Sequence, residues 1–235
     1  MKTLKLYITE ALHVNKNTKI TEYNYHPKTN SELKKLIKKL IKERGKNADL
    51  NDIDTSEITD MSHVFFELEF NGDISDWDVS NVTNMEHMFD NSPITTINFD
   101  LSNWDVSKVT NMNKMFYYCS AFTGKGLDKW NTSSLESAES MFSYCYYFNK
   151  DISNWDVSNL KNASFMFSSC YKFNQNLSKW NISNIEDMEC MFSYCDELKQ
   201  DFSIWNIDQN KVDCHNMFKG CNKMTNKLLP KGITI

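Results

Sequence analysis

The sequence lacks the features that most readily reveal a membrane protein or a secreted one. It contains no run of 18 apolar residues, so we expect no membrane-spanning segment. Near its start, Leu4, Leu6 and Ile8 alternate with polar residues, whereas a secretory signal has a continuous apolar stretch. We therefore expect neither membrane insertion nor signal-directed secretion.

Glycine, proline and catalytic motifs are also scarce. The chain has 6 Gly and 3 Pro among 235 residues, and no Gly-rich phosphate loop, H-E-x-x-H or G-x-S-x-G sequence. Its 5 His are scattered, and the adjacent Cys214 and His215 would point about 100° apart on a helix. We expect no enzymatic activity and no cofactor.

The 7 cysteines include no C-x2-C pair, which is the usual sign of a structural zinc site. Five of them follow a Phe by three residues in successive repeats: Cys119, Cys145, Cys170, Cys195 and Cys221. This column favours buried free thiols that pack as small apolar groups. A disulfide between adjacent members is an alternative, although parallel side chains rarely reach the required dihedral angle. A redox or metal protein built on the column is the third-ranked function.

The strongest positive feature is a repeat marked by tryptophan. The intervals are 27, 26, 25, 25 and 25 residues, and the positions are Trp77, Trp104, Trp130, Trp155, Trp180 and Trp205. A Phe follows the first five by 12 residues and the last by 13: Phe89, Phe116, Phe142, Phe167, Phe192 and Phe218. A fixed period of this length is typical of a stacked repeat protein, in which no unit buries its apolar face alone.

An additional, degenerate copy precedes the first Trp. Residues 53–65 match residues 77–89 in the order of their apolar positions. Terminal repeats are expected to be atypical because one of their faces caps the stack. Pro230 stands near the place of a further Trp, so we expect the array to end there, after seven units.

Residues 152–173 represent one unit. Trp155 and Val157 would point to one side and Asn154 and Asp156 to the other, as in a strand. Ser158 can then cap a helix of about two to three turns, since the apolar spacing beyond it becomes helical. We therefore predict an α/β repeat solenoid of about seven ~25-residue strand–helix units with a parallel sheet.

The first 50 residues do not repeat. The alternation at Leu4, Leu6 and Ile8 predicts a strand, and an apolar stripe after Pro27 predicts an amphipathic helix that is capped by Asn30 or Ser31 and ends near Gly45. We expect residues 1–50 to cap the repeat domain at 51–225, and residues 226–235 to form the C-terminal cap.

Charge is distributed unevenly along the chain. Residues 1–50 carry 12 Lys+Arg and 5 Asp+Glu, and subtracting this +7 from the total of −5 leaves −12 for residues 51–235. Such acidity argues against nucleic-acid binding by the repeats, and the favoured interpretation is that it mainly keeps a long surface soluble. The basic helix could itself contact a membrane or nucleic acid, but a capping role is favoured.

Two surfaces are candidates for partner binding. The first is a dense set of tyrosines around the Cys column: Tyr117, Tyr118, Tyr144, Tyr146, Tyr147, Tyr171 and Tyr194. Tyrosine combines large contact area with a hydrogen-bonding tip and is enriched at interfaces. The second is the exposed side of the predicted sheet, with Asp78, Asp105 and Asp156. These carboxylates could instead bond only to neighbouring backbone at a turn.

The run D-I-S-D-W-D-V-S-N-V-T-N-M at 73–85, followed by Met88 and Phe89, resembles a known repeat family. It is similar to the BspA-like leucine-rich-repeat surface proteins, in particular to their DUF285 repeats, over roughly residues 51–225. The resemblance implies a right-handed, leucine-rich-repeat-like solenoid with a parallel sheet on one face. It also implies attachment and protein binding without enzymatic activity. We predict a protein-interaction or attachment scaffold.

The chain differs from the larger members of that family, which have longer arrays and carry a secretion signal or lipid anchor. Short members without a signal resemble proteins carried by bacteriophages. The alternative function is therefore a structural subunit of a larger assembly such as a virion. On this basis we expect a cytoplasmic or virion-associated location.

Overall fold

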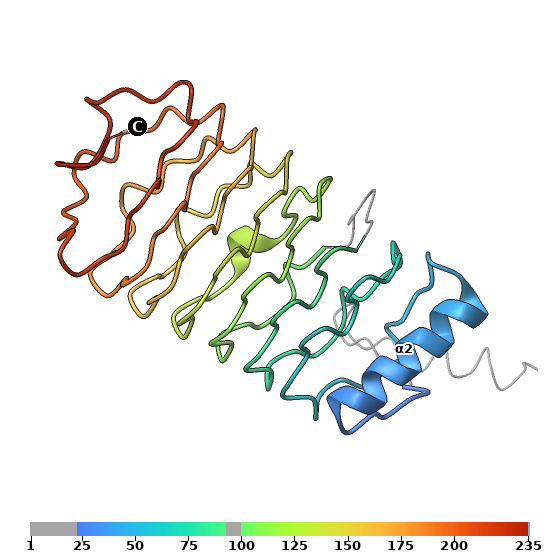
Figure 1. Cartoon of the computed structure of the whole chain (residues 1–235). Coiled ribbons are helices and arrows are strands. Elements are labelled where there is room, and N and C mark those ends of the chain that lie inside the picture. Colours follow the sequence, from blue (N-terminus) through green and yellow to red (C-terminus); the bar gives the residue numbers. More distant parts are fainter. Residues whose placement is uncertain (1–22, 93–99, 235) are drawn as a thin grey trace, which may run out of the picture.

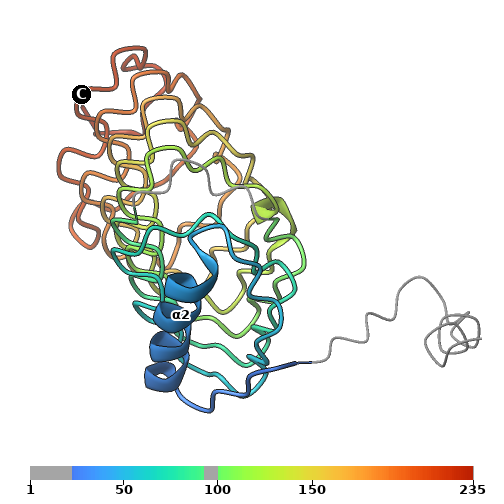
Figure 2. The same ribbon diagram turned by 90° about the vertical axis from the view of Figure 1, so that its right-hand side faces the viewer.

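The computed structural model describes residues 23–92 and 100–234. Along them the chain winds in successive coils that lie side by side between the two ends of the molecule (Figure 1). Viewed from the N-terminal end, the coils overlap one another behind helix α2 (Asn30–Arg44; Figure 2). We number them from the repeat as coils 1 to 7: 53–76, 77–103, 104–129, 130–154, 155–179, 180–204 and 205–229.

The one α-helix among the described residues, α2 (Asn30–Arg44), lies at the N-terminal end of the coils. The side chain of Thr29 caps it by accepting the N–H of Glu32 at 3.2 Å. Its apolar stripe is fully buried in the core that continues into coil 1: Leu33, Ile37 and Leu40. The predicted amphipathic helix is confirmed, with its cap one residue before the expected positions.

Neighbouring coils are joined by a row of parallel β-bridges, one residue per coil. The row contains Asp60, Asn84, Asn111, Ser137, Asn162, Asp187 and Asp213. Because each bridge involves a single residue, no strand forms within 23–92 and 100–234. One short 3-10 helix, η1 (Leu127–Lys129), lies at the end of coil 3.

After each bridge comes a turn segment whose N–H groups alternate between two kinds of partner. In coil 4, four alternate N–H groups from Ala138 to Tyr144 donate to carbonyl groups of coil 5 over 2.8–2.9 Å. Of the N–H groups between them, those of Met141 and Ser143 donate three residues back at 3.1 Å, and that of Glu139 donates to Oδ1 of Asn113 at 2.8 Å. Since half of the donors leave the coil, the i→i−4 bonds of an α-helix cannot form.

Two residues in every turn segment have left-handed backbone conformations. The first column, with φ of 52–57°, contains His63, His87, Lys114, Ser140, Phe165, Cys190 and Asn216. The second column, with φ of 49–74°, contains Glu67, Asn91, Tyr118, Tyr144, Ser169, Tyr194 and Gly220. In residues other than Gly this conformation costs about 1–2 kcal/mol. Because it recurs in every coil, it belongs to the architecture and does not by itself mark a site.

Aspartate and asparagine side chains stabilise the remaining corners. In coil 5, Oδ1 of Asp156 accepts the N–H of Ser158 at 3.0 Å, and Oδ1 of Asn162 accepts that of Ser164 at 2.9 Å. Each is an Asx turn, in which a side-chain oxygen replaces a backbone carbonyl. These turns explain how a chain with so few Gly and Pro forms so many corners.

The core consists of columns of identical side chains. Each Trp is nearly buried, and its Nε1 donates to a backbone carbonyl 27–30 residues earlier in the chain, as from Trp155 to Leu127 at 2.9 Å. The rings from Phe65 to Phe218 stack with centroids 5.2–5.8 Å apart. Stacking of the coils therefore buries apolar side chains that a single coil would leave exposed.

The predicted α/β solenoid of strand–helix units with a parallel sheet is wrong. The described residues form no strand around any Trp, where strands were expected, and isolated bridges such as that of Asn162 followed by tandem turns lie where helices were expected. Apolar residues at i and i+3 lie on one side of a tight turn as well as of a helix, so the spacing did not distinguish the two. The strand predicted around Leu4, Leu6 and Ile8 lies outside the described residues, and the domain limits at 50 and 225 stay predictions.

Candidate interaction surface

The predicted tyrosine surface, which we call the tyrosine edge, follows the Phe column in coils 3 to 6. Tyr118, Tyr144 and Tyr194 occupy the second left-handed column, with φ of 59–62°. The others lie just before or after that column: Tyr117, Tyr146, Tyr147 and Tyr171. The turn segments therefore set the direction of the tyrosine edge.

Five members of the tyrosine edge form a continuous cluster of rings. Tyr118 and Tyr144 have centroids 4.9 Å apart, and Tyr117 contacts Tyr144 edge-on at 5.6 Å. Tyr146 stacks on Tyr171 at 4.9 Å with an interplanar angle of 4°. Tyr146 also contacts Tyr118 at 6.4 Å, which joins the two groups. The structure thus brings together rings from three successive coils.

The tyrosine edge is accessible to a partner. Tyr118, Tyr171 and Tyr194 expose 45%, 40% and 47% of their surface, and Tyr147 exposes 63%. Tyr147 and Tyr194 have no ring contact within the described residues, so they stand apart from the cluster. A hydrogen bond with Tyr118, together with burial, raises the pKa of Tyr146 to about 12. Tyr146 therefore carries no charge over the physiological pH range.

A groove of about 430 Å³ lies beside the tyrosine edge and crosses coils 3 to 7. Tyr117, Tyr144 and Tyr194 line it. Buried serines also line it: Ser140, Ser143, Ser168, Ser169 and Ser193. We call this the serine groove. The hydroxyl groups of Ser168 and Ser193 are 2.8 Å apart and bond to each other.

Opposite charges lie at the coil 3 side of the serine groove, and a single lysine lies at the other. Lys114 Nζ is 3.8 Å from Glu139 Oε1, and Lys219 lines the groove in coil 7. The groove thus combines aromatic rings, hydroxyl groups and a few charges, which suits recognition by contact and hydrogen bonding.

The acidic candidates lie apart from the tyrosine edge, about half a coil away in the chain. Asp78, Asp105 and Asp156 are exposed, but in each case Oδ1 accepts the N–H of the Ser two residues later at 3.0 Å. These hydrogen bonds lower the pKa of Asp105 and Asp156. One oxygen of each carboxylate therefore stabilises a turn, and binding by this row stays a prediction.

The five column cysteines are buried, and all seven are free thiols. Each column Sγ donates to the carbonyl of the Phe in the preceding coil, as from Cys145 to Phe116 at 3.0 Å. Burial raises the pKa of the column thiols, to about 12 for Cys221. Ser92 occupies the same position in coil 2, and its hydroxyl donates to the Phe65 carbonyl at 2.7 Å. The column is thus a set of neutral donors joining coils.

Sequence reasoning missed the serine groove. Ser143, Ser168 and Ser193 occupy the same register in coils 4, 5 and 6, immediately before the second left-handed column. Aligning the coils would have shown the row, but not that it is buried next to the tyrosines. The burial of this row depends on a left-handed backbone at residues other than Gly. No residue type predicts that conformation from the sequence.

In the part of the chain that the structure describes, no group of three or more His, Cys, Asp or Glu side chains could hold a metal ion. No helix there is long and apolar enough to span a bilayer.

Comparison with known proteins gives one match. The model of a family described as "Mycoplasma protein of unknown function, DUF285" matches residues 32–126 and 119–230. No curated protein and no solved structure matches the chain. Since the two segments together run from residue 32 to residue 230, the chain belongs to the DUF285 family.

Proposed function

We propose that this chain is a non-catalytic protein-binding module whose contact surface is the tyrosine edge together with the serine groove. The observation that carries the proposal is the ring cluster of Tyr117, Tyr118, Tyr144, Tyr146 and Tyr171, which is partly exposed on three successive coils. An attachment role, as in BspA-like surface proteins, is a narrower form of the same proposal.

Pre-ordering of the rings supports binding. Tyrosine provides contact area at a low conformational cost because it has few rotatable bonds. Here the rings already contact one another, so less side-chain freedom is lost when a partner binds. The hydroxyl groups of the serine groove supply hydrogen-bonding sites beside this aromatic surface.

The reactive residue types are already engaged in the architecture, which supports a non-catalytic role. The hydroxyl of Ser168 bonds to that of Ser193 rather than to a histidine that could activate it. The Cys145 thiol donates to a backbone carbonyl, and burial raises its pKa, so it is not a thiolate at neutral pH.

The test uses substitutions to residues that other coils carry at the same position, so that the fold is retained. Tyr118→Asn copies Asn91 of coil 2, and Tyr144→Ser copies Ser169 of coil 5. The double variant should lose most of the partner that the wild-type chain captures from its native source after cross-linking. Asp78→Asn copies Asn131 of coil 4 and is the matched control for the other candidate surface.

Three outcomes are informative. Loss of capture by the tyrosine variant alone, with an unchanged unfolding transition, supports the proposal. Loss by Asp78→Asn alone would move binding to the Asp row. Unchanged capture in both folded variants would remove both surfaces. Size fractionation of the native source adds a further test, because co-migration with a very large particle would instead favour the assembly-subunit function.

A further inference from the structure

The last coil leaves a row of backbone donors unpaired. In coil 6, the N–H groups of Met188, Cys190, Phe192 and Tyr194 donate to coil 7 over 2.7–2.9 Å. The equivalent groups of coil 7 belong to Cys214, Asn216, Phe218 and Gly220, and we call them the donor edge. Within residues 23–92 and 100–234, no oxygen accepts from any of the four. Phe218 is fully buried, and an unpaired buried donor is costly.

The donor edge offers no acceptors in return. The carbonyl groups of Cys214, Asn216 and Phe218 accept turn bonds within coil 7 at 3.0–3.2 Å. Asn216 and Gly220 are left-handed, with φ of 54° and 74°. Alternation of right- and left-handed residues directs N–H groups together into a concavity that suits anions. An ordinary β-strand presents donors and acceptors in alternation, so its backbone is a poor complement to this edge.

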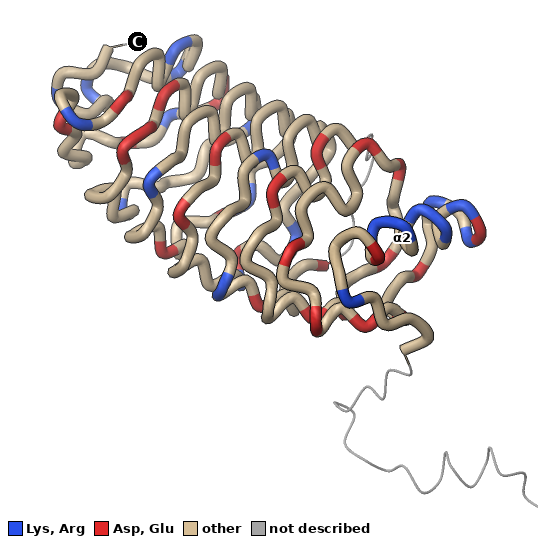
Figure 3. The backbone as a smooth tube through the Cα atoms, turned by 60° about the horizontal axis from the view of Figure 1, so that its bottom comes forward, with Lys and Arg blue, Asp and Glu red and all other residues tan. Residues whose placement is uncertain are grey.

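The charge of this end fits an anionic partner. Residues 209–235 contain 5 Lys and 1 Asp, a balance of +4, whereas residues 51–208 contain 9 Lys and 25 Asp+Glu, a balance of −16. In Figure 3, lysine positions at the C-terminal end are coloured blue along the backbone tube. Acceptor-only carboxylates form their strongest hydrogen bonds with such charged and backbone donors. A basic segment at residues 209–235 therefore follows the acidic repeats at residues 51–208.

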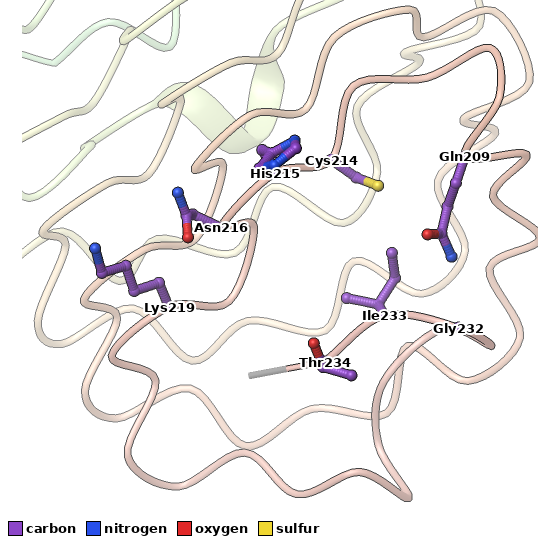
Figure 4. Close-up of a pocket in the computed structure, with 8 residues that line it drawn as sticks. All are labelled: Gln209, Cys214, His215, Asn216, Lys219, Gly232, Ile233 and Thr234. Atoms are coloured by element: carbon purple, nitrogen blue, oxygen red, sulfur yellow. The ribbon is translucent and has the colours of Figure 1, made fainter.

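The donor edge also has space in front of it. A cavity of about 510 Å³ is lined by Cys214, His215, Asn216 and Lys219 on one side. Gln209, Ile233 and Thr234 lie across from them (Figure 4). A second cavity of about 380 Å³ shares Gln209, Cys214 and His215. The end of coil 7 is thus hollowed beside two of the unpaired donors, those of Cys214 and Asn216.

A second copy of the chain does not fit as the occupant. Carbonyl groups of coil 1 would be the natural continuation, but Asn30 Nδ2 already donates to two of them, on Asp60 at 3.1 Å and on Ser62 at 3.0 Å. Two donor edges facing each other would lack acceptors. Both forms of end-to-end self-association are therefore unfavourable.

We propose that the donor edge and its lysines bind an acidic, extended peptide segment of a partner protein, whose carboxylates accept the N–H groups of coil 7. This proposal does not use the tyrosine edge, although Asn216 and Lys219 also line the serine groove. Lys211 and Lys219 lie beside the carboxylates and increase the affinity, while the N–H groups of Cys214 and Asn216, which border the cavity, fix their position.

The first measurement is fluorescence anisotropy of the full chain with a labelled peptide of alternating Asp and Ser. The Lys211→Glu, Lys219→Glu variant should bind the peptide about tenfold more weakly. The matched control is Lys179→Glu, Lys199→Glu, which reverses two exposed lysines of the body and should bind within about twofold of wild type. The Tyr118→Asn, Tyr144→Ser variant should bind as wild type, which separates this site from the tyrosine edge.

The second measurement is amide hydrogen exchange at residues in matched register. Cys214 and Asn216 should exchange faster than Met188 and Cys190 in the free chain, and the acidic peptide should slow only the first two. No peptide binding, equal losses in both lysine variants, or binding without protection of coil 7 would each overturn the proposal. So would equal affinity for a single-stranded oligonucleotide of the same charge.

Discussion

At each end of the stack, the backbone groups of the last coil have no neighbouring coil to bond with. The two ends differ in which groups, if any, take its place. Inside the stack, each turn segment receives N–H groups from the coil before it and donates to the coil after it. At the N-terminal end, Asn30 donates to the unpaired carbonyls of coil 1, and α2 covers the core. At the C-terminal end, the donors of coil 7 have no such partner among the described residues. The repeated residues thus pair the backbone N–H and carbonyl groups between coils. At the two ends, these groups need partners from residues outside the repeat.

The largest predicted effect contrasts the interior with the open end. Phe142 stacks between Phe116 and Phe167, so Phe142→Ala should lower the free energy of unfolding by about 3–5 kcal/mol. Phe218 stacks on coil 6 only, through Phe192 and Phe202, so Phe218→Ala should cost less. Urea unfolding of both variants measures the difference. Equal losses would mean that the open end is packed as fully as the interior.

The second prediction concerns the hydrogen bonds of Asn30 at the N-terminal end. Asn30→Ala leaves the Asp60 and Ser62 carbonyls without a donor and should destabilise the chain by about 1–3 kcal/mol. Asn159→Ala is the matched control because the exposed Asn159 Nδ2 donates to a single carbonyl, that of Ser133, at 2.7 Å. Thermal unfolding should show a smaller shift for the control. A larger shift for Asn159 would contradict a special role of Asn30.

The third prediction concerns alkaline pH. Burial raises the pKa of the Cys145 thiol above its ordinary 9.0, so the folded chain retains a proton that the unfolded chain loses. This contribution is complete below pH 9 and declines as the pH rises above it, by about 1.4 kcal/mol per pH unit. Cys145→Ser, which copies Ser92, should therefore make the alkaline loss of stability shallower by that amount. Unfolding curves at pH 8, 9 and 10 would reveal an unchanged slope if the idea is wrong.

The smallest predicted effect concerns an Asx turn, which is common to the whole stack. Asp156→Asn keeps the side-chain acceptor, as in Asn131 of coil 4, and should change stability at pH 7 by less than about 0.5 kcal/mol. Hydrogen bonds from Ser158 lower the pKa of Asp156 below 3.8, so its contribution is present above that pH and is lost as the pH falls below it. The variant should resist acid slightly better than wild type. Unfolding curves at pH 7 and pH 3 provide the comparison.

The sequence was informative where one residue type had one role. The period placed the Trp and Phe columns in the core, and the apolar stripe between Pro27 and Gly45 placed α2 correctly except for its cap, which is Thr29. The prediction failed where two conformations share one pattern, because the spacing of Val82, Met85 and Phe89 suits tandem turns as well as a helix. The choice between tandem turns and a helix depends on hydrogen bonds to the neighbouring coil. The residues that make those bonds lie about 25 positions away along the chain.

The candidate sites were predictable to different degrees. Counting tyrosines was enough to locate the tyrosine edge, since Tyr118, Tyr144 and Tyr146 are close in register. The donor edge could not be read from residue types, because Cys214 and Asn216 contribute through backbone N–H groups that every residue except Pro carries.

The direction of the bonds between coils gives the stack an electrical polarity. In every junction from coil 1 to coil 7, four turn-segment N–H groups point toward the C-terminal end, while one to three backbone bonds run in the opposite sense. Aligned peptide dipoles add, as they do along a helix, so positive potential accumulates at coil 7 and negative potential at coil 1. Approaching charged molecules are thereby oriented along the axis before contact, independently of the side chains they finally meet.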